Sequence, residues 1–334
     1  IEYFQKALEF NLKGADIYVR LGDLYGKKGN YKKAEEYLEK ALKLTPDSPD
    51  IYQSMGDIYN RKGNYAKAEE YLEKALKLTP NSPDIYQSMG DIYNRKGKYV
   101  KAEEYFEKAL KLNPNSSDIY QSMGDIYNRK GNYDKAEEYL VKALKLNPNS
   151  SDIYQSMGDL YNRKGEYDKV EGYLERALQF KPNDFNIYFN LANIYARKGD
   201  YTKSIELLKK SIQLNPVYVD SIMELGNIYR NIGNYSKAID CYENALKINP
   251  KFSDLYSNLG YIYKIIGDYA KSIEYYKKYI QFNPNNPDIY NNLANIYLMK
   301  GDTVNILNQI CELRRLGRND FVNELEESIG MSEK

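Results

Sequence analysis

The sequence predicts an all-α solenoid, in which antiparallel helix pairs repeat along the chain. Three observations carry this prediction. Prolines stand 34 residues apart with no insertion between them, at Pro46, Pro80, Pro114, Pro148, Pro182, Pro216, Pro250 and Pro284. Each repeat contains two stretches whose apolar residues have helical spacing. A glycine separates the two stretches in every repeat, where it favours the end of one helix before the next begins.

The pattern is clearest in residues 49–82, PDIYQSMGDIYNRKGNYAKAEEYLEKALKLTPNS. Its apolar residues include Ile51, Met55 and Ile58 in the first stretch and Ala68, Leu72 and Ala75 in the second. Both sets have the spacing of an amphipathic helix. Pro80 stops the second helix, and Gly63 ends the first. Because only a short turn separates them, the two helices must be antiparallel neighbours.

We predict full repeats between two partial elements. Residues 1–14 have the pattern of the second helix of a cut repeat, in which Phe4 and Leu8 match Leu38 and Leu42. The repeats occupy residues 15–48, 49–82, 83–116, 117–150, 151–184, 185–218, 219–252, 253–286 and a degenerate 287–318. Residues 319–334 are predicted to form a capping helix and a tail, because terminal repeats must close the open end of the core.

Composition excludes several classes of function. Lys plus Arg number 48 against 47 Asp plus Glu, so no strong net charge attracts nucleic acid or an anionic membrane. No apolar run approaches the roughly 20 residues that span a bilayer. The chain has no His, and Cys241 and Cys311 stand far apart, so we expect no metal, no cofactor and no enzyme active site. The rarity of cysteine indicates a reducing compartment, and we expect a cytoplasmic protein.

The repeat resembles the tetratricopeptide repeat, a helix-turn-helix unit of the same length. The resemblance rests on Tyr52, Gly56, Tyr59, Ala68, Ala75 and Pro80 and on their copies in the other repeats. The chain departs from the family pattern at Val170 and Ser204, which replace the first of the two alanines. The resemblance implies a right-handed superhelix whose first helices line a concave groove. It also implies a protein that binds other proteins in that groove.

One polar stripe remains on the first helix once the packing residues are set aside. In the first five repeats the stripe consists of Asp50, Gln53, Ser54, Asp57, Asn60, Arg61 and their copies. Its candidate ligand contacts are Asp57, Arg61, Asp91, Arg95, Asp125 and Arg129. Two interpretations stay open. Each Asp and Arg pair supports its own helix as a surface ion pair, or the stripe contacts a polar or basic partner.

From the sixth repeat onward the stripe changes character. It carries asparagines at Asn190, Asn193, Asn227, Asn258, Asn292 and Asn295, with apolar neighbours at Phe189, Met223 and Tyr261. A carboxamide offers a donor and an acceptor together, so a ladder of them can pair with the backbone of an extended peptide. Such a ladder is similar to one with which the tetratricopeptide family holds extended polypeptide. The alternative is that these asparagines are ordinary polar surface and that the capping helix covers Ile265 and Met299.

The function that these patterns favour is a non-catalytic scaffold for protein–protein interaction, which binds an extended or helical peptide segment in the groove. Two other hypotheses remain. The near-identical repeats and the N-terminal edge at Phe4 and Leu8 favour a structural module that stacks on another copy of itself. The chain also has the pattern expected of a regulatory arm that recruits substrates to a catalytic part upstream of Ile1.

Overall fold

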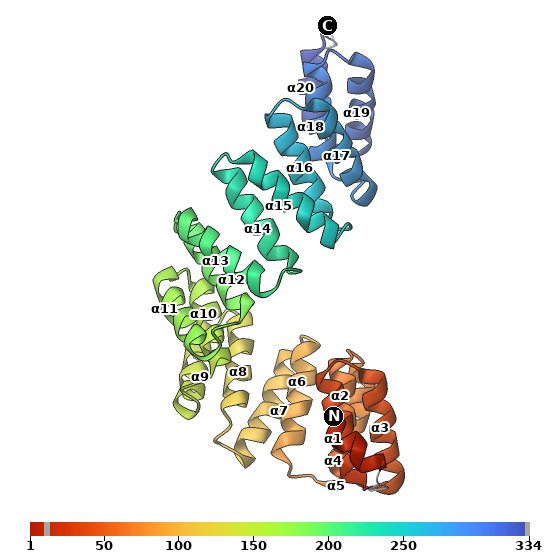
Figure 1. Ribbon diagram of the computed structural model, residues 1–334, viewed down its shortest axis with the longest axis vertical. Helices are drawn as coiled ribbons and strands as arrows, with labels where there is room; N and C mark the ends of the chain where they lie inside the picture. Colours follow the sequence, from red (N-terminus) through yellow and green to blue (C-terminus); the bar gives the residue numbers. More distant parts are fainter. Residues whose placement is uncertain (10–13, 331–334) are drawn as a thin grey trace. The chain divides into compact units, whose positions relative to one another are not determined.

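The computed structural model describes residues 1–9 and 14–330, without the side chains of residues 7–9, and all its regular elements there are α-helices. After α1 (Glu2–Glu9) come α2 (Ala15–Lys27) with α3 (Tyr31–Leu44), α4 (Pro49–Arg61) with α5 (Tyr65–Leu78), α6 (Pro83–Arg95) with α7 (Tyr99–Leu112), α8 (Ser117–Arg129) with α9 (Tyr133–Leu146), α10 (Ser151–Lys164) with α11 (Tyr167–Phe180), α12 (Phe185–Arg197) with α13 (Tyr201–Leu214), α14 (Val219–Asn231) with α15 (Tyr235–Ile248), α16 (Ser253–Ile265) with α17 (Tyr269–Phe282), α18 (Pro287–Met299) with α19 (Thr303–Arg315), and finally α20 (Asn319–Ser328). The predicted α-solenoid of helix pairs is confirmed (Figure 1).

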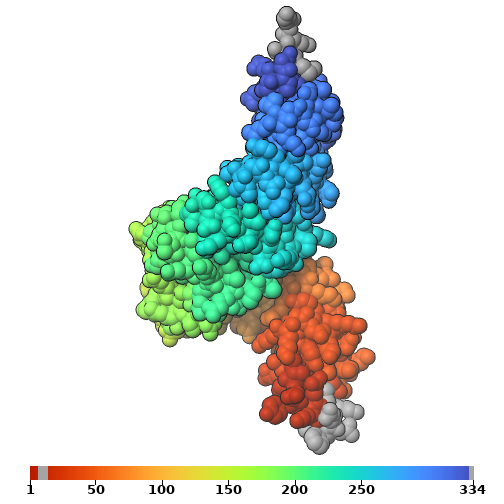
Figure 2. All heavy atoms as spheres, turned by 45° about the horizontal axis from the view of Figure 1, so that its top comes forward, coloured from red at the N-terminus to blue at the C-terminus, as the bar shows by residue number. Residues whose placement is uncertain are grey.

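The chain divides into two compact units. The N-terminal unit comprises residues 1–181, which include α1 to α11, and the C-terminal unit comprises residues 182–334, which include α12 to α20. Within each unit every pair packs internally and then against the pair that follows it. In Figure 2 the surface of each unit is accordingly made of consecutive blocks of sequence. The predicted edge at Phe4 is half-buried on α1, and the side chain of Leu8 lies outside the described residues.

The turn inside each pair follows from local chemistry. Gly63 has a φ of 81°, which L side chains rarely adopt, and a glycine with positive φ stands at this point in every pair. The Asn64 backbone N–H donates to the Tyr59 carbonyl at 2.9 Å, which closes the first helix. The Asn64 side chain then accepts from the Lys67 backbone N–H at 3.3 Å and caps the second helix.

The first helices of the N-terminal unit form one continuous layer. Contacts join α2 to α4, α4 to α6, α6 to α8 and α8 to α10 directly. Each second helix packs instead on the first helix of its own pair and on that of the next pair. First helices therefore approach one another, while second helices are set apart on the other side. We call the face of the first helices that the second helices leave uncovered the inner wall.

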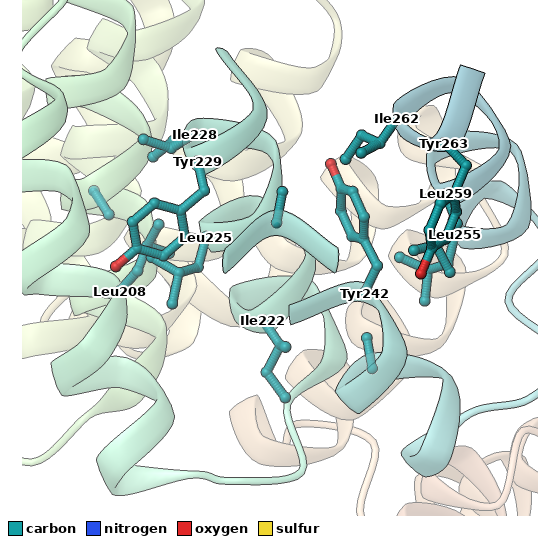
Figure 3. Packing of buried hydrophobic residues seen from close by; sticks show 13 residues of the cluster. Leu208, Ile222, Leu225, Ile228, Tyr229, Tyr242, Leu255, Leu259, Ile262 and Tyr263 are labelled. Atoms are coloured by element: carbon teal, nitrogen blue, oxygen red, sulfur yellow. The ribbon is translucent and has the colours of Figure 1, made fainter. Parts of the chain in front are cut away.

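The core of each pair is built by setting a small residue against a large one. A Cβ atom at Gly90 would lie 2.5 Å from Cε1 of Phe106, and one at Gly226 would lie 2.6 Å from Cε1 of Tyr242. Both contacts are too close for any side chain, so only glycine lets the two helices approach here. In Figure 3 the Tyr242 ring lies between side chains of α14, such as Leu225, and side chains of α16, such as Leu255.

Serines replace some of the small residues at these helix contacts without leaving a polar group unpaired. The buried Ser204 hydroxyl donates to the Ala192 carbonyl at 2.7 Å, and the buried Ser272 hydroxyl donates to the Gly260 carbonyl at the same distance. Both bonds cross from the second helix of a pair to its first helix. The departure from alanine at Ser204 is thus accommodated by a hydrogen bond that satisfies the hydroxyl.

Tyrosine stacking joins the two helices of a pair, and lysine–glutamate bridges join neighbouring pairs. Tyr59 stacks on Tyr71 with ring centroids 5.5 Å apart. Lys62 reaches back to Glu35 of the preceding pair at 2.6 Å. The same bridge recurs as Lys96 to Glu69, Lys130 to Glu103 and Lys164 to Glu137. These contacts account for much of the high tyrosine content, and none of them uses a residue of the polar stripe on the inner wall.

Candidate functional site

Hollows lie between neighbouring first helices along the inner wall of the N-terminal unit. A hollow of about 640 Å³ lies between α2 and α4, one of about 330 Å³ between α4 and α6, and one of about 340 Å³ between α8 and α10. The lining residues include all the candidates from the first repeats, namely Asp57, Arg61, Asp91, Arg95, Asp125 and Arg129. Residues far apart in the sequence therefore meet around hollows of similar chemistry.

The aspartates of this wall are in an environment that does not favour their charge. Burial raises the pKa of Asp57 from 3.8 to about 6, although a hydrogen bond from Ser88 and the nearby Arg61 both lower it. Burial also raises the pKa of Asp91 to about 6, and the neighbouring Asp57 raises it further. The pKa of Asp125 is raised to about 6, again mainly by burial.

In an ordinary surface ion pair of this chain, the pKa of the carboxyl group is lowered instead of raised. The pKa of Glu70 is lowered, chiefly by its hydrogen bond to Lys74 in the next turn of α5. At Asp57 the effect of burial exceeds that of Arg61, so the carboxylate is not compensated by its own helix. Arg61 itself is exposed. These facts favour the ligand interpretation of the stripe over helix support.

Three asparagines of the first helices have a buried amide oxygen that is unpaired among the described residues. The Oδ1 atoms of Asn60, Asn94 and Asn128 are buried and accept no hydrogen bond from any residue that the structure describes. Asn60 is only 7% exposed and lines the hollow between α4 and α6, and Asn128 is 5% exposed and lines the hollow between α8 and α10. A buried polar atom without a partner costs about 1–3 kcal/mol, so the wall repeatedly presents acceptors that need a donor.

Asn60 belongs to the polar stripe, but neither it nor its copies were among the site residues predicted from the sequence. Their recurrence at the same place in successive repeats was the available signal. Burial of their oxygen atoms depends on how closely the next first helix approaches, and the sequence pattern does not specify that distance.

The asparagines of the C-terminal unit have partners within the chain. The Tyr242 hydroxyl donates to Oδ1 of Asn227 at 2.7 Å, and Nδ2 of Asn227 donates to Glu224 at 2.9 Å. Arg230 donates to Oδ1 of Asn258 at 2.9 Å. In the same way Lys264 of α16 donates to Asn292 of α18 at 3.2 Å, and Asn295 donates to Asn291 at 3.4 Å. Asn258 and Asn292 are therefore joined to the preceding first helix, whereas Asn227 is bonded within its own pair and Asn295 within α18.

The remaining candidates of the C-terminal unit divide into packed and exposed side chains. Phe189 contacts the edge of Tyr218 with centroids 5.4 Å apart, and Met223 packs against the core. Asn190 and Asn193 are half-buried. Tyr261 is 46% exposed, Ile265 43% and Met299 61%, so the capping helix α20 does not cover Ile265 and Met299. Exposed apolar area of this kind is available to a partner.

A comparison of two adjacent pairs shows what Asn227 contributes. Tyr242 and Tyr276 occupy the same place in successive pairs, and each lies against a glycine of its first helix. Tyr242 has Asn227 as an acceptor, whereas the corresponding first-helix residue of the next pair is Tyr261. The buried Tyr276 hydroxyl has no hydrogen-bond partner among the described residues.

We expect Tyr242→Phe to lower the free energy of unfolding by about 1–2 kcal/mol, because Asn227 loses its donor. Tyr276→Phe is expected to leave stability unchanged or to raise it, because it removes an unpaired buried hydroxyl. Thermal unfolding followed by circular dichroism compares the two variants. Equal destabilisation by both would contradict the assignment. Tyr261→Asn supplies the missing acceptor and should stabilise the chain by about 1 kcal/mol.

The described part of the chain offers little for metal chemistry or membrane insertion. No group of three or more His, Cys, Asp or Glu side chains in residues 1–9 and 14–330 could hold a metal ion. In the same residues, no helix is both long and apolar enough to cross a bilayer.

The stacked pairs and their polar inner wall define the class of the protein: it is an α-solenoid repeat protein. Family models described as tetratricopeptide repeat match residues 14–81, 47–115, 81–149, 115–183 and 185–218, and one described as TPR repeat matches residues 226–265 and 260–301. The first of these models alone covers residues 14–183, which is 170 of the 334 residues. The chain therefore belongs to the tetratricopeptide repeat family, whose repeats generally mediate protein–protein interactions.

Solved structures agree on the fold. The Cut9–Hcn1 hetero-tetramer of APC/C is 16% identical with a TM-score of 0.62, and the match covers 88% of this chain and 58% of that one. A tetratricopeptide repeat protein from Parabacteroides merdae is 21% identical with a TM-score of 0.54, covering 72% and 95%. The pilF protein of Pseudomonas aeruginosa is 22% identical with a TM-score of 0.51, covering 62% and 94%. A comparison with curated proteins found no match.

Proposed function

We propose that the chain is a non-catalytic scaffold that binds an extended or helical segment of another protein along its inner wall. The single observation that supports this most is the recurrence of the same side chains, Asp, Asn, Ser and Arg, around separate hollows of the N-terminal unit. A long wall with repeated polar contacts suits a polypeptide, whose backbone offers donors and acceptors at regular intervals. Membership of the tetratricopeptide repeat family supports the same function.

The proposed site has two parts. In the N-terminal unit its polar contacts are Asp57, Arg61, Asp91, Arg95, Asp125 and Arg129. In the C-terminal unit the site combines polar and apolar contacts, namely Phe189, Asn190, Asn193, Met223, Asn227, Asn258, Tyr261, Asn292 and Asn295. There the asparagines would use the hydrogen-bonding capacity that their contacts within the chain leave, and Tyr261 would add exposed apolar surface. Asn227 also supports Tyr242, so it is a poor choice for mutation.

Selection of peptides from a random display library on the full chain tests the proposal. Selected peptides are then measured against a wall variant, which combines Asp57→Asn, Asp91→Asn and Asp125→Asn, and against Asn258→Ala with Asn292→Ala. The matched control is an outer-face variant, which combines Glu70→Gln, Glu104→Gln and Glu138→Gln. It removes the same charge from exposed positions of second helices.

We expect each selected peptide to lose about tenfold or more in affinity on at least one of the two inner variants, and to bind the outer-face variant as it binds the unchanged chain. A library that yields no binding peptide contradicts the proposal. Peptides that lose affinity only on the outer-face variant place binding on the other side of the solenoid and contradict it equally.

A further inference from the structure

The first helices of the second to fifth pairs, which carry most of the inner wall of the N-terminal unit, are more uniform in sequence than the second helices of the same pairs. Helices α4, α6, α8 and α10 have the same Asp, Gln, Ser, Asp, Asn and Arg at their six wall positions. Their second helices, α5, α7, α9 and α11, differ from one another at eight of fourteen positions. Duplication alone would leave both helices equally alike. The wall therefore presents the same subsite several times in succession.

Each subsite presents hydrogen-bond acceptors in a negative environment. The wall carries two carboxylates for each guanidinium, and the guanidinium groups of Arg61, Arg95 and Arg129 are exposed while Asp57 and Asp91 are half-buried. The arginines line the same hollows, but their effect on the pKa of the aspartates is smaller than that of burial, so the carboxylates are compensated only in part. At the foot of the hollows the amide oxygen atoms of Asn60 and Asn128 have no donor. A group with N–H donors and a positive charge would satisfy both kinds of oxygen.

We propose that the N-terminal unit recognises a polypeptide segment in which lysine or arginine recurs, with successive basic side chains donating to the Asp and Asn oxygen atoms of successive first helices. This inference rests on the proposed function and adds the chemistry of the partner. Identical subsites require a ligand that repeats its own chemistry. A phosphate chain would face two carboxylates in every repeat, so the wall disfavours nucleic acid.

The wall also contains groups that suit a polypeptide backbone. Gln53 and Gln87 line the hollows together with Ser54 and Ser88. Between α8 and α10 two such groups already bind each other, since the amide Nε2 of Gln121 donates to the Ser156 hydroxyl at 3.0 Å. Carboxamides and hydroxyls both donate and accept, which matches the amide and carbonyl groups of a main chain. A free polyamine carries positive charge, but it has no carbonyl group to accept hydrogen bonds from these glutamines and serines.

Fluorescence anisotropy on the full chain tests the inference. The probes are a labelled peptide of repeated Lys-Gly-Ser, the same peptide with Glu in place of Lys, and the same peptide with Gln in place of Lys. Labelled oligouridylate represents an anionic nucleic acid. Unlabelled spermine, used as a competitor, represents a cation without a peptide backbone. Each probe is measured with the unchanged chain, the wall variant, the outer-face variant, and a fourth variant that combines Asn60→Ala, Asn94→Ala and Asn128→Ala.

We expect the lysine peptide to bind the unchanged chain and the outer-face variant equally, and to lose about tenfold or more in affinity on the wall variant and on the asparagine variant. The Asp→Asn changes keep side-chain shape, so the wall variant gives an answer even where the asparagine variant does not fold. Equal binding of the lysine and glutamine peptides, or equal losses on the outer-face variant, overturns the inference. Tighter binding of oligouridylate, or full displacement of the peptide by spermine at equal charge concentration, also overturns it.

The failures of the two proposals can be told apart. If display-selected peptides bind the inner wall but the lysine peptide does not, the basic partner is wrong and the scaffold function stands. If neither class of peptide binds, both proposals fail.

Discussion

Phe106→Ala is expected to lower the free energy of unfolding by about 3–5 kcal/mol, because it leaves a large cavity in the core of the third pair. Phe106 is fully buried on α7, and its ring fills the space that Gly90 of α6 leaves open. Chemical denaturation of the full chain followed by circular dichroism measures the change. A loss of less than about 1 kcal/mol would contradict the packing described here.

The opposite change at the same contact, a larger residue at Gly90, tests whether Gly90 and Phe106 depend on each other. Gly90→Ala is expected to cost about 1–3 kcal/mol, because its Cβ would lie 2.5 Å from the Phe106 ring. The double variant Gly90→Ala with Phe106→Leu should be close to the unchanged chain, since the chain itself sets Ala192 and Leu208 at these positions. Gly172→Ala is the control. No atom lies within 4 Å of its Cβ, so it should gain about 1 kcal/mol from helix propensity alone.

Acidification from about pH 7 to about pH 5 is expected to raise the melting temperature of the chain. Asp57, Asp91 and Asp125 have folded-state pKa values of about 6 against 3.8 for an unperturbed Asp. Between these values the folded state binds more protons than the unfolded state, so its stability rises as the pH falls. The chain has no histidine, so few other side chains titrate in this window.

The trend should reverse at lower pH. The pKa values of Glu70 and Glu138 are lowered by hydrogen bonds to Lys74 and Lys142, so their contribution to stability is lost as the pH falls below about 4.5. A melting temperature that rises toward about pH 5 and then declines is the expected profile. The wall variant should flatten the rise and be the more stable protein at about pH 7. A wall variant less stable than the unchanged chain would show that the aspartates support their helices.

This prediction distinguishes the two interpretations of the polar stripe. A helix-supporting Asp stabilises the folded chain as a carboxylate, whereas Asp57 in its hollow is disfavoured in that form. Residues that reduce stability and recur unchanged have a role outside folding, which is typical of binding sites. The unpaired amide oxygen atoms of Asn60 and Asn128 have the same consequence.

The sequence predicted the helix pairs because each determinant is local. The glycine at Gly63, the cap at Asn64 and the apolar spacing around Leu72 act within one repeat, and the period repeats them. The face of the stripe also followed from spacing, and the aspartates that it selected do line hollows. Contacts between helices could not be predicted in the same way. The bond from Tyr242 to Asn227 and the burial of Asn60 depend on distances between helices that a pattern of residue types does not determine.

Photo-crosslinking of a display-selected peptide tests the central claim most directly, because it reports which face of the solenoid the peptide contacts. A photoreactive phenylalanine is placed at Gln87, which lines an inner hollow, or at Glu104, which is exposed on the outer helix α7. We predict that the peptide crosslinks to the chain modified at Gln87 and not to the chain modified at Glu104. Crosslinking at Glu104 alone would contradict the account.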